Sequence, residues 1–210
     1  MRFAPAAFLT ALLLSTAPAL ATPEHYDFDK AHTNIVFYIS HMGFSEMVGR
    51  FSDFNGTLTL DMDKPEESKV DVTIKPASVK TSSDQLNEHL QDDKFFNTAK
   101  FPDMHFVSKS VKVTAAGGSG KDAHDLADVT GDLTLLGVTK PVVLHVRLNK
   151  ADYNPMTNNF EAGFTAEGTL KRSDFGMSAY VPMVGDDVRI FISTEAINTD
   201  RAKQQSPAKH

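Results

Sequence analysis

The feature that most constrains this chain is a strict alternation of apolar and polar residues over many segments. In one stretch, Leu133 and Leu135 share a face of an extended chain, and Val142, Leu144 and Val146 share a face of the next. Successive side chains of a strand point to opposite faces, so a period of two predicts half-buried β-strands. The apolar faces then meet either in a packed core or around a cavity.

Eight segments carry this pattern. In the second segment Phe51 is out of step with Phe54, which predicts a bulge or a bend near Ser52 and Asp53. The segments expected to form strands are residues 32–41, 49–61, 69–75, 103–113, 125–136, 141–149, 160–171 and 186–197.

One short helix is expected between the third and fourth of these strands. Ser82 opens a capping box, and Leu86 and Leu90 lie four residues apart on one helix face. Phe95 and Phe96 follow in a loop. We expect these four apolar side chains to form a lid over one end of the strands; the alternative is that they only hold the helix in place.

The length of the strands favours a closed barrel over a sandwich. Several segments reach ten residues or more, beyond the usual five or six. Eight strands enclose an interior that side chains can fill or that can hold one ligand. Ala162, Ala166 and Gly168 share one face of their strand, and such small residues either leave space or fit a tapering interior. The predicted fold is all-β, an eight-stranded antiparallel barrel with a short helix closing one end.

Composition excludes several classes of function. The net charge is −6, whereas nucleic-acid binding needs clustered Lys and Arg. The sequence has no cysteine, which excludes thiol redox chemistry and thiolate zinc. Arg50, Arg172 and Arg189 lie near strand ends and are expected in surface salt bridges. We therefore expect no nucleic-acid partner.

Catalytic and metal sites are not indicated either. His32 and His41 lie nine residues apart on one predicted strand, so their side chains point to opposite faces, and His145 is out of phase with its apolar neighbours. Asp186 and Asp187 are adjacent and also face opposite sides, which rules out a paired-carboxylate site. We expect no catalytic residue, no metal and no required cofactor.

The two ends of the chain differ from the middle. Residues 1–21 combine an early Arg2, an apolar run and an Ala-Leu-Ala ending, which predicts a cleaved signal peptide and a periplasmic location. An uncleaved membrane anchor is the alternative. Residues 22–198 are expected to form one barrel domain, and the polar tail 199–210 is expected to be disordered.

Several longer motifs make the chain resemble the YceI-like family. They are LNEHLQDDKFFNTAKFPDMHFVS, GDLTLLGVTKPV, SDFGM and VGDDVRI, in the family's order within Tyr26–Ile197. The resemblance implies a lipocalin-like barrel of a periplasmic polyisoprenoid-binding protein. It implies that the barrel interior, the lumen, takes the isoprenoid tail of a quinone or a related lipid. Homodimers are also known in that family.

The candidate lumen residues are apolar side chains that share a strand phase or lie close to strand ends. Plain core packing is the alternative for each, and His41 is the expected contact for a lipid head group. The candidates are Phe37, Ile39, Phe44, Met47, Phe51, Phe54, Leu133, Leu135, Phe164, Phe175 and Met177.

The expected function is periplasmic binding, storage or transport of an isoprenoid lipid, with a membrane surface as the place of exchange. Burying one five-carbon isoprene unit is worth roughly 3–4 kcal/mol, so the tail would supply the affinity. Two alternatives remain. One is an enzyme that acts on such a lipid, and the other is a structural or stress-protective barrel.

Overall fold

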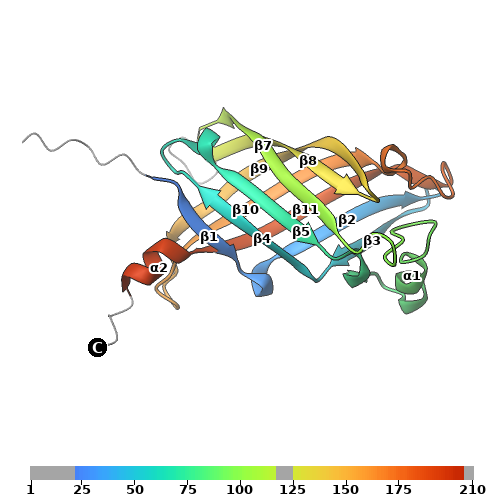
Figure 1. Cartoon of the computed structure of the whole chain (residues 1–210), viewed down its shortest axis with the longest axis horizontal. Helices are drawn as coiled ribbons and strands as arrows, with labels where there is room; N and C mark the ends of the chain where they lie inside the picture. The colour runs from blue at the N-terminus through green and yellow to red at the C-terminus, as the bar shows by residue number, and fades with distance from the viewer. Residues whose placement is uncertain (1–21, 117–124, 206–210) are drawn as a thin grey trace, which may run out of the picture.

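A single antiparallel sheet winds into a barrel in the computed structural model, which describes residues 22–116 and 125–205 (Figure 1). Eight strands close the ring in the order β1-β4-β5-β7-β8-β9-β10-β11, because β11 pairs with β1 as well as with β10. Three more strands, β2, β3 and β6, extend the sheet from the other half of β11. The all-β, eight-stranded antiparallel barrel predicted from the sequence is confirmed.

The elements have the following bounds. The strands are β1 (Glu24–Phe28), β2 (Asn34–His41), β3 (Ser45–Phe51), β4 (Phe54–Leu60), β5 (Lys69–Ile74), β6 (Val79–Lys80), β7 (Met104–Ala115), β8 (Asp125–Leu135), β9 (Val138–Tyr153), β10 (Phe160–Lys171) and β11 (Val184–Asn198). The α-helices are α1 (Asp84–His89) and α2 (Thr199–Gln205), and the 3-10 helices are η1 (Lys30–His32), η2 (Pro65–Glu67), η3 (Pro76–Ser78) and η4 (Arg172–Phe175).

The bend predicted near Ser52 and Asp53 is present. Strand β3 ends at Phe51 and β4 begins at Phe54, so one long wall strand is broken in two. The hydroxyl of Ser78 accepts hydrogen bonds from the backbone N–H groups of Ser52 (3.2 Å) and Asp53 (3.0 Å). The break therefore costs the backbone little, because its free donors find a side-chain acceptor.

Helix α1 begins one residue later than expected. Its N-cap is Ser83 and not Ser82, and the Ser83 hydroxyl accepts a hydrogen bond from the N–H of Leu86 at 3.3 Å. Strands β1 and β6 were not expected from the sequence, because neither carries a run of alternating apolar residues long enough to show a period.

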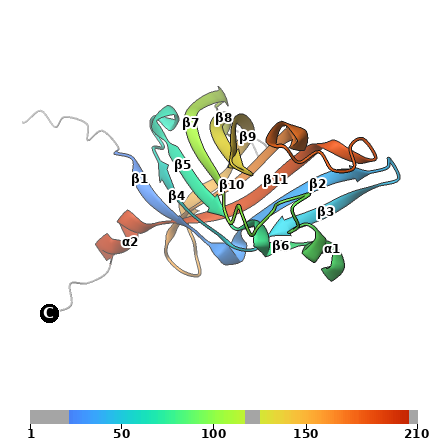
Figure 2. The same cartoon turned by 45° about the vertical axis from the view of Figure 1, so that its right-hand side comes forward.

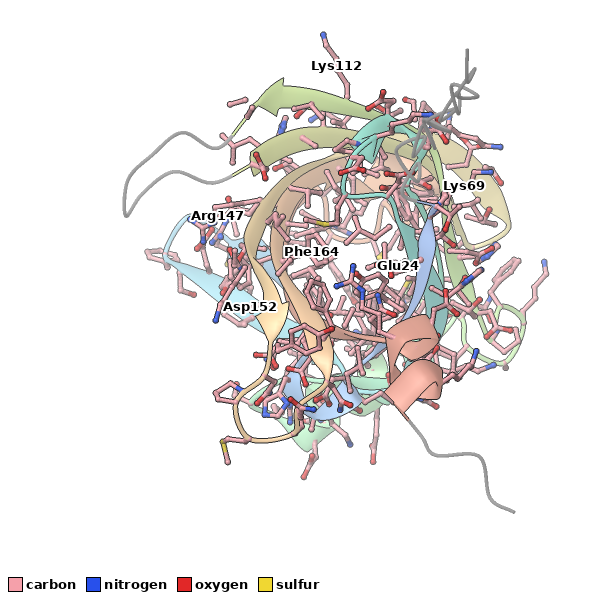
Figure 3. All side chains as sticks on the ribbon, turned by 90° about the vertical axis from the view of Figure 1, so that its left-hand side faces the viewer. Glu24, Lys69, Lys112, Arg147, Asp152 and Phe164 are labelled. Atoms are coloured by element: carbon pink, nitrogen blue, oxygen red, sulfur yellow. The ribbon has the colours of Figure 1, made fainter. Side chains whose placement is uncertain are left out.

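Two clusters of apolar side chains divide the interior along the barrel. The first occupies the half towards α1 and includes Phe51, Phe106 and Leu135. The second cluster includes Tyr26 and Phe164. It occupies the end next to α2, where Figure 3 shows Phe164. The barrel is therefore filled at its α2 end.

Small residues in the wall do not by themselves create space. Gly49 lies opposite Phe37, and a Cβ atom on Gly49 would lie 2.2 Å from the Phe37 ring. Gly131 is covered in the same way by Phe106, at 2.4 Å, and Ala162 is fully buried in the second cluster. At these positions the tapering interior, and not a void, explains the small side chains.

The tail is partly ordered, which corrects the expectation of disorder. Residues 199–205 form α2, tied to β1 at the closed end of the barrel. Glu24 accepts hydrogen bonds from both Nε and Nη2 of Arg201 at 2.8 Å, and Asn198 accepts one from the Arg201 N–H. The predicted signal peptide, residues 1–21, and residues 206–210 lie outside the described residues.

Replacing Arg201 by alanine is expected to lower the free energy of unfolding by about 1–2 kcal/mol, because it removes a two-bond ion pair that is partly shielded from water. It also removes the guanidinium that stacks 3.9 Å from the Phe160 ring centroid. Denaturant unfolding measures the change. Lys203→Ala is the matched control, since its side chain is 77% exposed and its nearest carboxylate is 3.8 Å away. Equal stabilities for the two variants would contradict this account of α2.

Candidate functional site

A cavity of about 430 Å³ lies in the half of the barrel towards α1. Small-molecule sites in proteins usually measure about 300–1,000 Å³. Its walls come from β2, β3, β5 and β7 to β11, with α1 and the loop after it on one side. The residues of the second cluster do not line it, so the cavity ends where that cluster begins.

The apolar faces of the β8–β9 hairpin look into this cavity. Leu133 and Leu135 of β8 line it, as do Val142 and Leu144 of β9. Leu136 and Gly137 form the two-residue turn between the strands, both with positive φ, as the right-handed twist of a hairpin favours. The alternation in the sequence therefore lines a cavity in this half of the barrel.

Twelve of the residues singled out in the sequence come together around the cavity, four of them in the expected lid. The lining also includes residues that were not singled out, and these share the inward phase of their strands, such as Phe106, Leu170, Ile190 and Ile192. The twelve are Phe37, Ile39, His41, Met47, Phe51, Leu86, Leu90, Phe95, Phe96, Leu133, Leu135 and Met177.

Four candidate lumen residues lie outside the cavity. Phe44 is 89% exposed in the β2–β3 turn, and Phe164 packs in the second cluster at the closed end. Phe54 is buried against Phe28, with ring centroids 6.3 Å apart. Phe175 is buried in the first cluster without reaching the cavity surface. Phase tells which face a side chain takes, but neither its depth along the barrel nor its place in a loop.

Arg172 is the charged group of the cavity wall, and its place corrects the expected surface salt bridge. The residue is only 2% exposed. Its guanidinium donates hydrogen bonds to four backbone carbonyls, those of Met177, Ala179, Val184 and Gly185, at 2.8–3.0 Å. Burial lowers the pKa of Arg172, and the nearby Asp186 carboxylate opposes this. Arg172 therefore fixes the loop between η4 and β11.

Asp186 supports the same loop from the other side. Its carboxylate accepts hydrogen bonds from the N–H of Ser173 at 2.9 Å and from the Ser173 hydroxyl at 2.8 Å. These hydrogen bonds lower the pKa of Asp186. The two ends of the loop are thus held by charge-assisted hydrogen bonds, which are stronger than those between neutral groups.

The other polar side chains of the wall differ in whether they make hydrogen bonds within the protein. The Thr81 hydroxyl lies 2.8 Å from Asn87 Oδ1, and the His89 Nδ1 lies 3.1 Å from an Asp92 oxygen. The imidazole of His41 makes no hydrogen bond within the described part of the chain. Within the described residues, the His41 imidazole and the Tyr180 hydroxyl of the wall therefore keep hydrogen-bonding capacity that a ligand could take up.

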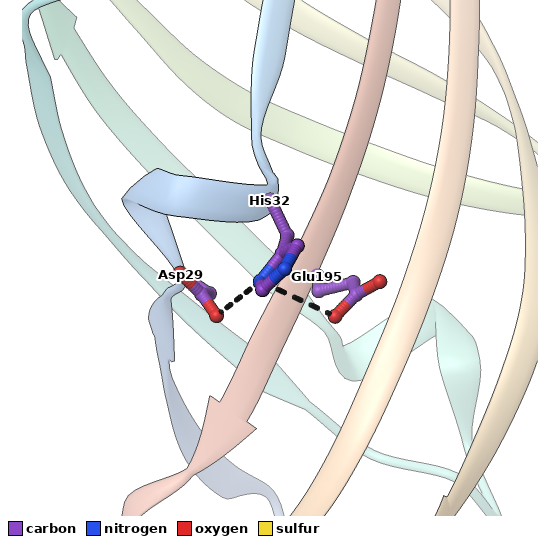
Figure 4. Close-up of side chains that lie close together, drawn as sticks. All are labelled: Asp29, His32 and Glu195. Atoms are coloured by element: carbon purple, nitrogen blue, oxygen red, sulfur yellow. Dashed lines mark hydrogen bonds and ion pairs between the residues drawn. The ribbon is translucent and has the colours of Figure 1, made fainter.

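A second group of chemically active side chains lies on the outside of the barrel (Figure 4). The Nδ1 atom of His32 is 2.8 Å from Asp29 Oδ2 and 3.9 Å from Glu195 Oε2. The hydrogen bond between His32 and Asp29 lowers the pKa of Asp29 and raises that of His32. The sequence does not reveal the group, because the pairing of β1 with β11 brings Glu195 to the other two. His32 is largely exposed, and the group is separate from the cavity.

Among the described residues, no helix has the length and apolar character needed to cross a bilayer.

Comparison with known proteins gives a consistent result. A model of the YceI-like domain matches residues 26–196. The protein YceI of Escherichia coli is 40% identical over 186 residues, which cover 89% of this chain and 92% of the relative.

Solved structures share the fold. The crystal structure of a YceI protein from Campylobacter jejuni superposes with a TM-score of 0.65 at 32% identity, covering 76% of this chain and 89% of the other. A polyisoprenoid binding domain from Saccharophagus degradans, implicated in plant cell wall breakdown, superposes with a TM-score of 0.59 at 15% identity and covers 84% of this chain and 99% of its own. The match of the domain model and the identity to the Escherichia coli protein show that this chain belongs to the YceI-like family.

Proposed function

We propose that this protein binds an isoprenoid lipid, a polyisoprenoid or an isoprenoid quinone, and stores or transports it. The observation that carries the proposal is the apolar cavity, which the second cluster closes at one end. A few isoprene units at roughly 3–4 kcal/mol each would give micromolar affinity or better after the cost of ordering the chain. The structural similarity to a polyisoprenoid binding domain supports the same ligand class.

The head group is proposed to lie near His41. The free imidazole can donate or accept one hydrogen bond, which suits a quinone carbonyl, a hydroxyl or a phosphate. Three other polar side chains of the wall, those of Thr81, His89 and Arg172, make hydrogen bonds within the protein. This supports a binding role rather than turnover of the lipid, with no cofactor beyond the bound ligand.

The periplasm is the proposed location. The support is the composition of residues 1–21, which matches a secretory signal peptide. Exchange of the lipid at a membrane surface is part of the proposal, because a long isoprenoid has little solubility in water. The homodimer that the family resemblance implies stays a prediction.

Extraction of the purified protein with organic solvent, followed by mass spectrometry, tests the proposed function. We expect close to one isoprenoid lipid per chain when the protein is purified without detergent, and we expect labelled lipid to move between the protein and vesicles unchanged. An extract without isoprenoid, from protein that also takes up none from vesicles, would overturn the proposal. Conversion of the added lipid into a product would point to an enzyme instead.

A further inference from the structure

Six large apolar side chains stand exposed at the end of the barrel opposite α2. Phe44 is the most exposed at 89%, followed by Met183 at 57% and Met42 at 54%. They come from two segments, the β2–β3 turn with the start of β3 and the loop before β11, which project together at this end (Figure 2). We call this set the rim: Met42, Phe44, Val48, Tyr180, Val181 and Met183.

The rim is continuous with the cavity. Met42, Val48, Tyr180 and Met183 are both exposed to solvent and part of the cavity wall. The cavity therefore opens to the outside between them. The N–H of Met42 donates a 2.7 Å hydrogen bond to the carbonyl of Met183, which ties the two rim segments together. The rim is thus an apolar border around the mouth of an apolar cavity.

The charge around the mouth indicates what kind of surface the rim can meet. Residues 41–48 and 177–184 contain no Lys or Arg and a single carboxylate, that of Glu46, which is paired with Arg189 at 3.2 Å. The whole chain is acidic, with a net charge of −6. Attraction to anionic lipid head groups needs Lys or Arg, so contact would depend on apolar insertion.

We propose that the rim docks on the surface of a lipid bilayer and inserts Phe44 and Met183 at the boundary between the head groups and the acyl chains. This inference rests on the proposed function, since it gives the isoprenoid tail a path from bilayer to cavity without crossing water. Aromatic and Met side chains suit such an irregular apolar contact. A second copy of the chain is a poorer occupant, because a standard protein interface uses about 20–30 residues on each side and the rim has six.

The absence of tryptophan from the sequence allows a direct test. Phe44→Trp places one fluorophore on the rim. With phosphatidylcholine vesicles we expect its emission to shift to shorter wavelength and to be quenched by brominated acyl chains, at low and high salt alike. Met156→Trp is the matched control, because Met156 is 92% exposed in the β9–β10 turn at the other end. Its emission should not change.

A second variant measures the consequence. Phe44→Asp should slow lipid transfer between protein and vesicles roughly tenfold or more, while the lipid content stays unchanged, because Phe44 does not line the cavity.

The outcomes of these experiments separate the inference from the proposed function. If vesicles neither shift nor quench the emission of the Phe44→Trp protein while the extracts contain isoprenoid, the rim inference is overturned and the proposed function stands. If that emission is quenched but extracts and uptake assays show no isoprenoid, the proposed function is overturned and the docking stands. A shift without vesicles that follows a doubling of mass in sedimentation would assign the rim to self-association and overturn the inference.

Discussion

Replacing Leu135 by arginine is expected to remove bound isoprenoid from the protein, with an affinity loss of at least about 100-fold. Leu135 is 6% exposed and lines the cavity, as do Leu133, Val142 and Leu144. A guanidinium there would either face hydrocarbon without a partner or hold water in the cavity. Both outcomes cost several kcal/mol relative to the filled apolar site. Mass spectrometry of solvent extracts measures the loss.

Two further variants separate this effect from a general loss of folding. Leu126→Arg lies on the same strand, but Leu126 is 39% exposed and outside the cavity wall, so its lipid content should match the unaltered protein. Leu133→Trp adds volume without charge and should select a shorter tail rather than none. Thermal unfolding checks that each variant is folded. A folded Leu135→Arg protein with its full lipid content would contradict the proposal that this cavity holds the lipid.

The second large effect is expected at Arg172. Arg172→Met should lower the free energy of unfolding by about 3 kcal/mol or more, because it leaves four carbonyl groups around a buried position without their donor. For a chain of this length that corresponds to a fall in Tm of roughly 6–12 °C. Thermal unfolding and denaturant titration measure the two quantities. The loop between η4 and β11 should also exchange its amide protons faster, which hydrogen exchange detects.

Matched variants define the cause. Arg172→Lys keeps the charge, but one ammonium group cannot reach four carbonyls in the geometry of a guanidinium, so it should recover little of the lost stability. Arg189→Met removes a guanidinium whose side chain is 45% exposed, which bonds to Glu46 and stacks over Tyr38, and should cost less than about 1 kcal/mol. Similar losses for Arg172→Met and Arg189→Met would contradict the assigned role of the four carbonyls.

The sequence predicts the strands well because the signal is local. Alternation assigns Leu135 and Phe164 to inward faces, and both do point into the barrel. It cannot say that Leu135 borders a cavity whereas Phe164 belongs to the second cluster at the closed end, because depth along the barrel depends on the stagger between strands that are distant in sequence. For the same reason the closing pair, β1 with β11, is invisible before the sheet is assembled.

The loops show a different limit. Phe44 lies in a turn, where no period relates its side chain to the strand faces. Arg172 resembles any charged residue at a strand end, and its partners are carbonyls of a loop whose path is fixed only in the folded chain. A charged residue bonded to backbone carbonyls has no partner that can be identified by residue type. This is why the sequence suggested an ordinary surface ion pair at that position.

The plug formed by the second cluster gives the barrel a blind end. In the proposed lipid complex, the hydrocarbon terminus would enter first and lie against the second cluster, and the polar group would stay at the entrance. Departure would reverse the order, so whatever receives the lipid would meet the polar group first. The distance from the entrance to the second cluster would also set the preferred chain length. A longer lipid would leave isoprene units outside the cavity, and a shorter one would make fewer apolar contacts.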